Sequence, residues 1–196
     1  MCSIEHAGRS TPDGLRLQLM RETITMDSSY IMPFVESTTS VFETMVGLDV
    51  SISKPHREDS MATTRHDVSA IIGLSGDLTG FVVLTFPVET ASAVVESFTG
   101  AHVDPTTEAE DFGDAVGELV NMIAGSAKGR IEGMNVSISC PTVVIGSGHV
   151  VTQPSDALCI RIPCSVEAGE FAVDICMKKA KSDAASPTNT QSANAA

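Results

Sequence analysis

The amino-acid sequence predicts an α+β fold, an antiparallel sheet with helices packed on one face. Segments with helical spacing of apolar residues are each followed by shorter strand-like segments, so a helix-then-three-strands theme occurs twice. Neighbouring strand-like segments are joined by short, glycine-containing turns, which are typical of antiparallel hairpins. The repeated theme suggests pseudo-duplicated α-β-β-β halves, although residue identity between the halves is weak.

The first half opens with a predicted helix from Tyr30 to Val46, where apolar residues recur at near-helical spacing. Pro33 suits its first turn and Gly47 suits its end. A short strand from Leu48 to Ser53 follows. The stretch from Lys54 to Arg65 is charged and contains a proline, which favours a loop.

A hairpin and a short helix complete this half. The segment from His66 to Leu74 alternates apolar and polar residues, and the segment from Thr79 to Phe86 is almost wholly apolar, as in an interior strand. Ser75-Gly76-Asp77 supplies the turn between them. A helix is predicted from Val88 to Phe98, closed by Gly100.

The second half contains the longest predicted helix, from about Thr107 to Gly133, capped by Thr106 or Thr107. The acidic residues of its first turn favour the positive end of the helix dipole. Three predicted strands close the domain, Asn135 to Val144, Ala157 to Ser165 and Glu170 to Met177, with turns at Gly146-Ser147-Gly148 and Glu167-Ala168-Gly169.

The length of 196 residues fits one domain with additional tails. We expect residues 1–27 to form a loose extension, with Met26 as an alternative start, residues 28–179 to form the domain, and residues 180–196 to be disordered. The formal net charge of −13 disfavours binding to nucleic acid or to anionic membrane. No apolar run is long enough to span a membrane, and a secretory signal is not apparent, so we expect a cytoplasmic protein.

The cysteines and histidines do not predict a metal site or a disulfide framework. The five cysteines are Cys2, Cys140, Cys159, Cys164 and Cys176, and no two of them form a Cys-x-x-Cys motif. We therefore expect reduced thiols that are buried in strands. The five histidines lack ligand spacing as well, and no metal is predicted.

The long helix separates into two faces at 100° per residue. The face expected to meet the sheet consists of apolar residues: Phe112, Val116, Leu119, Val120, Ile123 and Ala127. Asp114, Glu118, Asn121 and Gly125 form a stripe on the other side, at spacings that make them neighbours along the helix. Gly125 and the nearby Gly117 each cost about 0.5–1 kcal/mol relative to alanine. Either this is an ordinary solvated face with tolerated glycines, or it lets another surface approach closely.

The segment Glu118-Leu119-Val120-Asn121-Met122-Ile123-Ala124-Gly125 resembles the signature of the CheC/CheX/FliY family of phosphatases. That signature is a glutamate, an asparagine three residues later and a glycine four residues after that, within a long helix. The segment from Met32 to Met45 also resembles the opening helix of the CheX branch. The resemblance extends from about Tyr30 to Met177.

The resemblance implies a protein phosphatase that accelerates dephosphorylation of the aspartyl phosphate on a CheY-like response regulator in chemotaxis-type signalling. Asn121 would orient the attacking water, and Glu118 would pair with a lysine of the regulator. Gly125 would allow close approach of the partner, and Asp114 would contribute to docking. No cofactor of its own is expected, because the regulator supplies the Mg²⁺.

The first helix bears on the number of active sites. Some members of the family carry the Glu-x-x-Asn pair on both pseudo-symmetric helices, whereas here the equivalent stretch is Glu36-Ser37-Thr38-Thr39. The resemblance therefore implies one active site per chain, and a homodimer formed through the sheets. Two alternatives remain open at this point: a non-catalytic module that docks on a receiver domain or flagellar partner, and a structural dimer that has kept the motif by descent.

Overall fold

The computed structural model describes residues 28–57, 66–152, 154 and 156–180. The predicted extension at residues 1–27 lies outside these residues, as do residues 58–65 of the predicted loop and the predicted tail from residue 181. The described helices are η1 (Ser28–Tyr30), α2 (Met32–Val41), η2 (Phe42–Val46, a π-helix), α3 (Val88–Thr99) and α4 (Ala109–Arg130). The described strands are β1 (Ser51–Ile52), β2 (His56–Arg57), β3 (His66–Gly76), β4 (Leu78–Phe86), β5 (Val136–Ile138), β6 (Thr142–His149), β7 (Leu158–Val166) and β8 (Gly169–Lys179).

The described strands form one antiparallel sheet in the order β1-β7-β8-β4-β3-β5. β2 also pairs with β7, and β6 also pairs with β3. The hairpins β3–β4 and β7–β8 adjoin in the centre of the sheet, where β4 pairs with β8. The first strand of each half, β1 or β5, pairs with the hairpin of the other half: β1 with β7, and β5 with β3. This exchange is the arrangement expected of two pseudo-duplicated halves.

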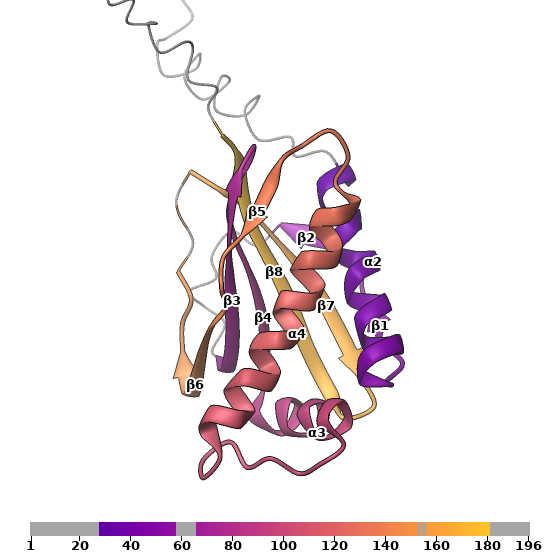
Figure 1. Cartoon of the computed structure of the whole chain (residues 1–196), viewed down its shortest axis with the longest axis vertical. Coiled ribbons are helices and arrows are strands. Elements are labelled where there is room, and N and C mark those ends of the chain that lie inside the picture. The colour runs from indigo at the N-terminus through magenta and orange to yellow at the C-terminus, as the bar shows by residue number, and fades with distance from the viewer. Residues whose placement is uncertain (1–27, 58–65, 153, 155, 181–196) are drawn as a thin grey trace, which may run out of the picture.

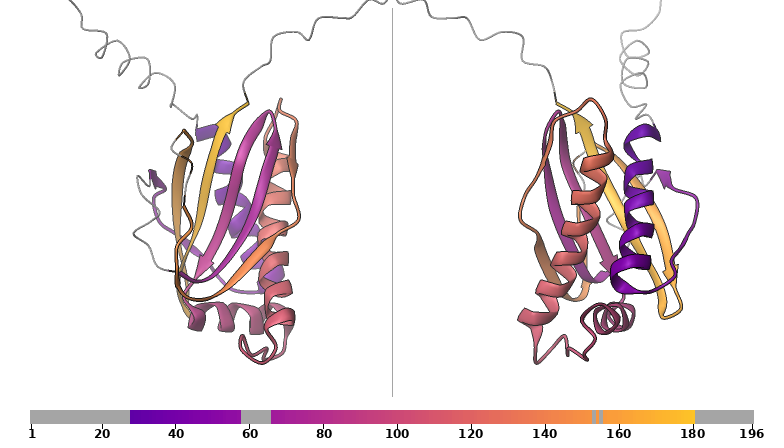
Figure 2. Two further views of the ribbon diagram at one scale, coloured as in Figure 1. Left: turned by 90° about the vertical axis from the view of Figure 1, so that its left-hand side faces the viewer. Right: turned by 45° about the vertical axis from the view of Figure 1, so that its right-hand side comes forward.

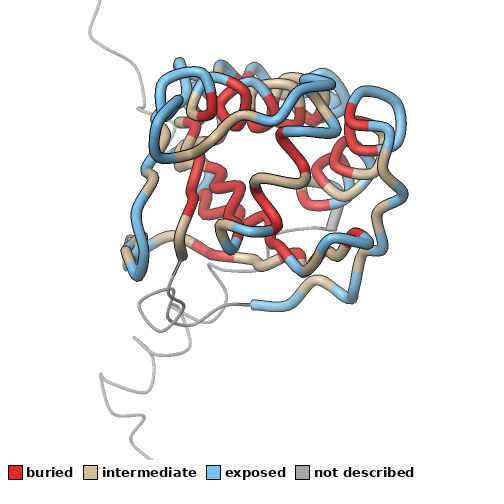
Figure 3. The backbone as a smooth tube through the Cα atoms, turned by 90° about the horizontal axis from the view of Figure 1, so that it is seen from below, coloured by how far each residue is buried: buried red, intermediate tan, exposed pale blue. Residues whose placement is uncertain are grey.

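The helices cover one face of this sheet, which confirms the predicted α+β class (Figures 1 and 2). α2 and α4 lie side by side along the sheet, and α3 crosses at one end. Buried residues gather between the helices and the sheet (Figure 3). The core includes a stack of three rings, in which Phe171 lies 4.6 Å from Phe42 and 5.0 Å from Phe86, centroid to centroid.

The predicted helices and the first hairpin are confirmed, with shifted ends. α3 ends at Thr99, and its C-cap residue Gly100 has a φ of 74°, which suits glycine. The predicted strand from Leu48 to Ser53 shortens to β1, and the segment predicted as a loop after it contains β2. These short strands were hard to predict because they depend on pairing with β7, which lies far away in the sequence.

Two predictions about the strand after the long helix are wrong. The predicted strand from Asn135 to Val144 divides into β5 and β6, because its register against β3 changes: Leu74 pairs with Ile138 but Ile71 with Thr142, which leaves one extra residue in this segment. Ser139 still follows β3, since its N–H donates to the Gly73 carbonyl and its Oγ accepts from the Gly73 N–H. The residues Gly146-Ser147-Gly148 are not a turn but part of β6. The register of β6 against β3 shifts between Val68, which pairs with Ile145, and His66, which pairs with His149. The three residues lie within this irregular part of the strand.

The prediction of reduced thiols is wrong for two cysteines. Cys159 and Cys176 form a disulfide, because the β7–β8 register places them directly opposite each other. They lie on the face of the sheet away from the helices, as the period-2 alternation with the core residue Ile175 requires. Cys164 is a buried thiol in β7, as predicted. Cys140 is exposed and lies between β5 and β6, so the prediction of burial in a strand is wrong for it.

Candidate functional site

The helix α4 carries the stripe that the sequence singled out. Its predicted sheet-facing residues are all fully buried. Asp114 and Glu118 are exposed, whereas Asn121 and Gly125 are partly exposed. All four therefore lie on the accessible side of one straight element, which holds their backbone positions fixed relative to the core.

The start of α4 differs from the prediction that Thr106 or Thr107 caps it. The helix begins at Ala109, and its N-cap residue, Glu108, makes no side-chain cap hydrogen bond. Instead Asp104 Oδ1 accepts hydrogen bonds from the backbone N–H groups of Thr106 at 2.7 Å and Thr107 at 2.9 Å. Glu108 Oε2 in turn accepts from the Asp104 N–H at 3.0 Å, so an aspartate-centred turn leads into the helix.

Asp104 gives this turn a pH dependence. The backbone N–H groups of Thr107 and Thr106 hold the pKa of Asp104 below its ordinary value of 3.8. Because the folded pKa is depressed, the stabilisation is complete above 3.8 and is lost as the pH falls through the lower folded pKa. We expect Asp104→Ala to lower the Tm by about 2–4 °C near pH 7.

Thermal unfolding followed by circular dichroism checks this prediction. The Tm difference between wild type and Asp104→Ala should shrink as the pH falls from 3.8 through the lower folded pKa, because the wild-type carboxylate is then protonated. Asp104→Asn, which keeps one acceptor oxygen, should lose less stability at pH 7 than the alanine variant. A difference that stays constant over this pH range would contradict the role given to the carboxylate.

Glu118 and Asn121 contact each other on the surface of α4. Asn121 Nδ2 donates to Glu118 Oε2 at 3.3 Å, one turn away. With its N–H₂ group held in this way, the amide oxygen of Asn121 remains an acceptor for a hydrogen bond from outside the chain. The arrangement thus combines a carboxylate that attracts a cation with an amide that stays polar at every physiological pH.

Glycines bring α4 close to the strands beside the stripe. A Cβ added at Gly117 would lie 3.4 Å from Pro141 Cγ and Val143 Cγ2, and one at Gly125 would lie 3.9 Å from Ile138 Cδ1. Gly117 therefore faces the chain's own residues Pro141 and Val143, and its missing side chain does not open space for a partner. Pro141 and Val143 consequently border the stripe, a neighbourhood that the sequence analysis missed because it depends on a long-range contact.

The pseudo-equivalent position on α2 is occupied by internal contacts. Arg130 Nη1 donates to Glu36 Oε2 at 3.1 Å, and Thr39 Oγ1 donates to the Val35 carbonyl at 3.1 Å. Ser37 and Ser126 join the two helices through a hydrogen bond of 3.0 Å. The glutamate thus already has a cationic partner, and the threonine hydroxyl is directed to its own helix. These contacts support a single candidate site per chain, on α4.

The described residues hold no group of three or more His, Cys, Asp or Glu side chains arranged to bind a metal ion. Among the same residues, no helix is both long and apolar enough to cross a membrane. The site consists of polar side chains on an accessible helix face.

The chain, including α4, is similar to known proteins. The family model described as chemotaxis phosphatase CheX matches residues 68–165, which include all of α4 and half of the chain. The chain belongs to the CheX family. A solved CheX from Desulfovibrio desulfuricans is 33% identical, covers 76% of this chain and 99% of its own, and superposes with a TM-score of 0.69.

Two further CheX proteins are similar. The CheY-P phosphatase CheX of Thermotoga maritima is 29% identical over 147 residues, which are 74% of this chain and 92% of that protein. CheX in the CheX–CheY–BeF3–Mg complex from Borrelia burgdorferi is 22% identical, with a TM-score of 0.66, covering 76% of this chain and 98% of its own. At that identity the second likeness concerns the fold alone.

Proposed function

We propose that this member of the CheX family is a phosphoaspartate phosphatase, which accelerates dephosphorylation of a CheY-like response regulator in chemotaxis-type signalling. The observation that carries the proposal is the Glu118–Asn121 pair on the accessible side of α4. It stands in a chain that is similar to the CheY-P phosphatase of Thermotoga maritima over most of its length.

Asn121 is the proposed catalytic residue. Hydrolysis requires a water oxygen to attack phosphorus in line with the bond to the aspartyl oxygen, which then leaves as a carboxylate with release of inorganic phosphate. Because there is little covalent work for the protein to do, positioning of the water accounts for much of the acceleration. The amide oxygen of Asn121 would accept a hydrogen bond from this water and direct its lone pair toward phosphorus.

Glu118 is the proposed docking residue, with Asp114 and Gly125 as further docking positions. The two carboxylates are exposed one turn apart, so they present negative charge to a cationic side chain of the regulator. Gly125 lies one turn beyond Asn121, and because it has no side chain, a partner could approach the helix backbone closely there. The Mg²⁺ beside the aspartyl phosphate belongs to the regulator, and we propose no cofactor for this chain.

We further propose a homodimer formed through the sheets and a cytoplasmic location. β6 pairs with β3, and among the described strands it has no pairing partner on its other side. Val144 on this strand is 36% exposed. An unpaired strand with an exposed apolar side chain favours association with a second sheet. Sedimentation equilibrium of the full chain would test the dimer.

Decay of a phosphorylated CheY-like regulator tests the proposed activity. The regulator is phosphorylated with a small-molecule phosphodonor, the donor is removed, and phosphate release is followed with and without this protein. The proposal expects faster decay that saturates with protein concentration. Unchanged decay, together with measurable binding of the regulator, would instead identify a non-catalytic docking module.

Substitution of Glu118 tests the docking role. We expect Glu118→Gln to raise the KM for the phosphorylated regulator about 5–10-fold, because a charge attraction is lost, with a smaller change in kcat. The effect should diminish at high salt. Glu43→Gln, which removes an exposed charge from η2, is the matched control and should leave the KM unchanged. A fall in kcat with an unaltered KM would contradict the docking role.

A further inference from the structure

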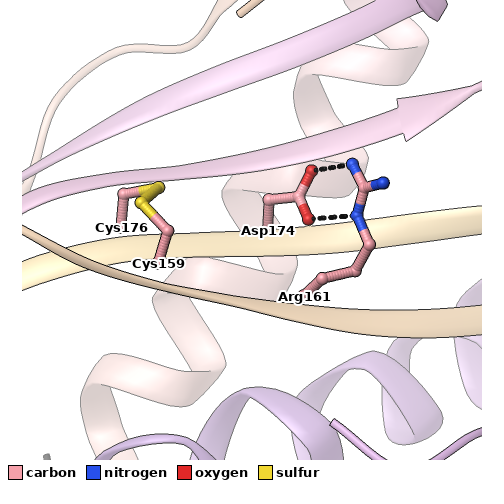
Figure 4. Close-up of a disulfide and its surroundings, with 4 residues drawn as sticks. All are labelled: Cys159, Arg161, Asp174 and Cys176. Atoms are coloured by element: carbon pink, nitrogen blue, oxygen red, sulfur yellow. Dashed lines mark hydrogen bonds and ion pairs between the residues drawn. A yellow bond between two sulfur atoms is a disulfide. The ribbon is translucent and has the colours of Figure 1, made fainter. Parts of the chain in front are cut away.

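The pair Cys159–Cys176 lies on the opposite face of the sheet from the candidate site. The two residues face each other across β7 and β8, with Cα atoms 4.1 Å apart (Figure 4). They form a small apolar cluster with the fully buried Val83. Partly buried hydrophobic residues pack against this cluster: Ile71, Phe81 and Val151. None of these residues belongs to α4, so the phosphatase proposal leaves the pair unexplained.

We propose that Cys159 and Cys176 form a reversible thiol–disulfide modification site, which stabilises the open end of the β7–β8 hairpin when oxidised. This inference does not rest on the phosphatase function. In the cytoplasmic location proposed above, a disulfide is characteristic of a redox-responsive pair rather than a permanent cross-link.

Reduction should leave the fold in place, because the hairpin does not depend on the cross-link for its register. β7 and β8 pair without interruption from Leu158↔Met177 to Val166↔Gly169. The next outward-facing pair, Arg161 and Asp174, joins the same two strands through two hydrogen bonds of 2.8 Å. Two neutral thiols behave as small hydrophobic side chains, so the apolar cluster suits the reduced pair as well.

Both cysteines are buried, and Cys176 lies in the interior strand β8, so a reductant reaches the S–S bond through local opening at Cys159. Cys159 is the second residue of β7, at the end of the hairpin away from its turn. β2 pairs with β7 at Ile160 and Arg161, and none of the described strands pairs with Cys159 on that side. Fraying of a few residues at a strand end requires much less free energy than global unfolding.

The nearby Cys164 has the opposite character. It lies in the core on the helix-facing side, where burial raises the pKa of its thiol to about 12. It is therefore protonated near neutral pH and disfavoured as an attacking thiol. Since Cys159 and Cys176 face away from it, exchange between the pair and Cys164 is not expected.

The redox chemistry balances with simple reagents. With hydrogen peroxide as oxidant, one thiolate is oxidised to a sulfenic acid, and the second thiol displaces water from it to form the S–S bond; the sum is two thiols and one peroxide giving a disulfide and two waters. With a small dithiol as reductant, one thiolate attacks the S–S bond and the second closes the reductant into its own disulfide, returning both cysteines as thiols.

The test uses the full chain equilibrated in mixtures of reduced and oxidised dithiothreitol. Peptide mass spectrometry after alkylation reports the state of Cys159 and Cys176, and circular dichroism reports the fold and the Tm. We expect reversible conversion, an unchanged helical spectrum, and a Tm about 5–10 °C higher in the oxidised form, since the cross-link closes a loop of 17 residues.

Two variants serve as controls. In Cys159→Ala/Cys176→Ala the Tm should not depend on the redox mixture, whereas Cys164→Ala should keep the redox-dependent shift. The proposal is overturned if the disulfide does not form at any ratio, if the Tm is the same in both states, or if the reduced wild type is unfolded, which would mark a permanent structural cross-link.

Discussion

Replacing Asn121 with alanine is expected to reduce the acceleration of regulator dephosphorylation by about 100-fold or more, because the attacking water loses its positioning group. The side chain is partly exposed and its one described hydrogen bond is to the surface residue Glu118, so stability should change little. Single-turnover decay at saturating protein measures the effect on the chemical step, separately from binding.

Thr39→Ala on α2 provides the matched control for this prediction. Thr39 stands at the pseudo-equivalent position, where its hydroxyl is bonded to the Val35 carbonyl of its own helix. This variant should therefore retain the wild-type decay rate. If Asn121→Ala also retained it, the proposed mechanism would be wrong even if the protein proved to be a phosphatase.

Removing one member of the Arg161–Asp174 pair is expected to have the largest effect on stability. Asp174 is 1% exposed and Arg161 is 13% exposed, and the pair is bidentate (Figure 4). Asp174→Ala leaves a guanidinium with little access to water and without this carboxylate, which should lower the free energy of unfolding by about 3–5 kcal/mol. Urea unfolding followed by circular dichroism measures this loss.

Two comparisons separate charge burial from general disturbance of the strand. Lys178 lies on β8, as Asp174 does, and forms an exposed ion pair with Asp156, which precedes β7. Lys178→Ala breaks this pair and should cost about 1 kcal/mol or less. Arg161→Met/Asp174→Leu removes both charges and should be more stable than Asp174→Ala. A double variant less stable than the single one would show that the ion pair itself dominates, rather than the penalty of a guanidinium that has lost Asp174.

The buried and exposed faces of a helix could be predicted from the sequence, because they follow from the spacing of apolar residues. The wheel of α4 placed Leu119 and Ile123 in the core and Glu118 on the surface, and the structure agrees. The ends of elements were predicted less well, because they depend on individual contacts. Asp104 rather than a threonine organises the start of α4, since its carboxylate reaches two backbone N–H groups at once.

Features that depend on register or on distant contacts were missed. The cysteines were assessed by local spacing, whereas Cys159 and Cys176 meet because the hairpin turn lies midway between them. The predicted three-residue turn at Glu167-Ala168-Gly169 would have set Cys159 opposite Met177. The structure pairs Val166 with Gly169, and this shift of one residue brings Cys159 opposite Cys176. The ion pair of Arg130 with Glu36 could not be predicted, because 94 residues separate its partners and no local pattern connects them.

The exchange of leading strands between the two halves has a consequence for how the chain folds. Ser51 of β1 pairs with Ser165 of β7, so this edge of the sheet closes only after roughly 110 intervening residues are in place. Contacts of such sequence separation slow folding, because the loop-closure entropy is lost before the contacts form. During synthesis on the ribosome, β1 has no partner until nearly the entire domain has emerged. A chain cut between α3 and α4 would yield two fragments that each lack part of their sheet, and that regain it only by binding each other.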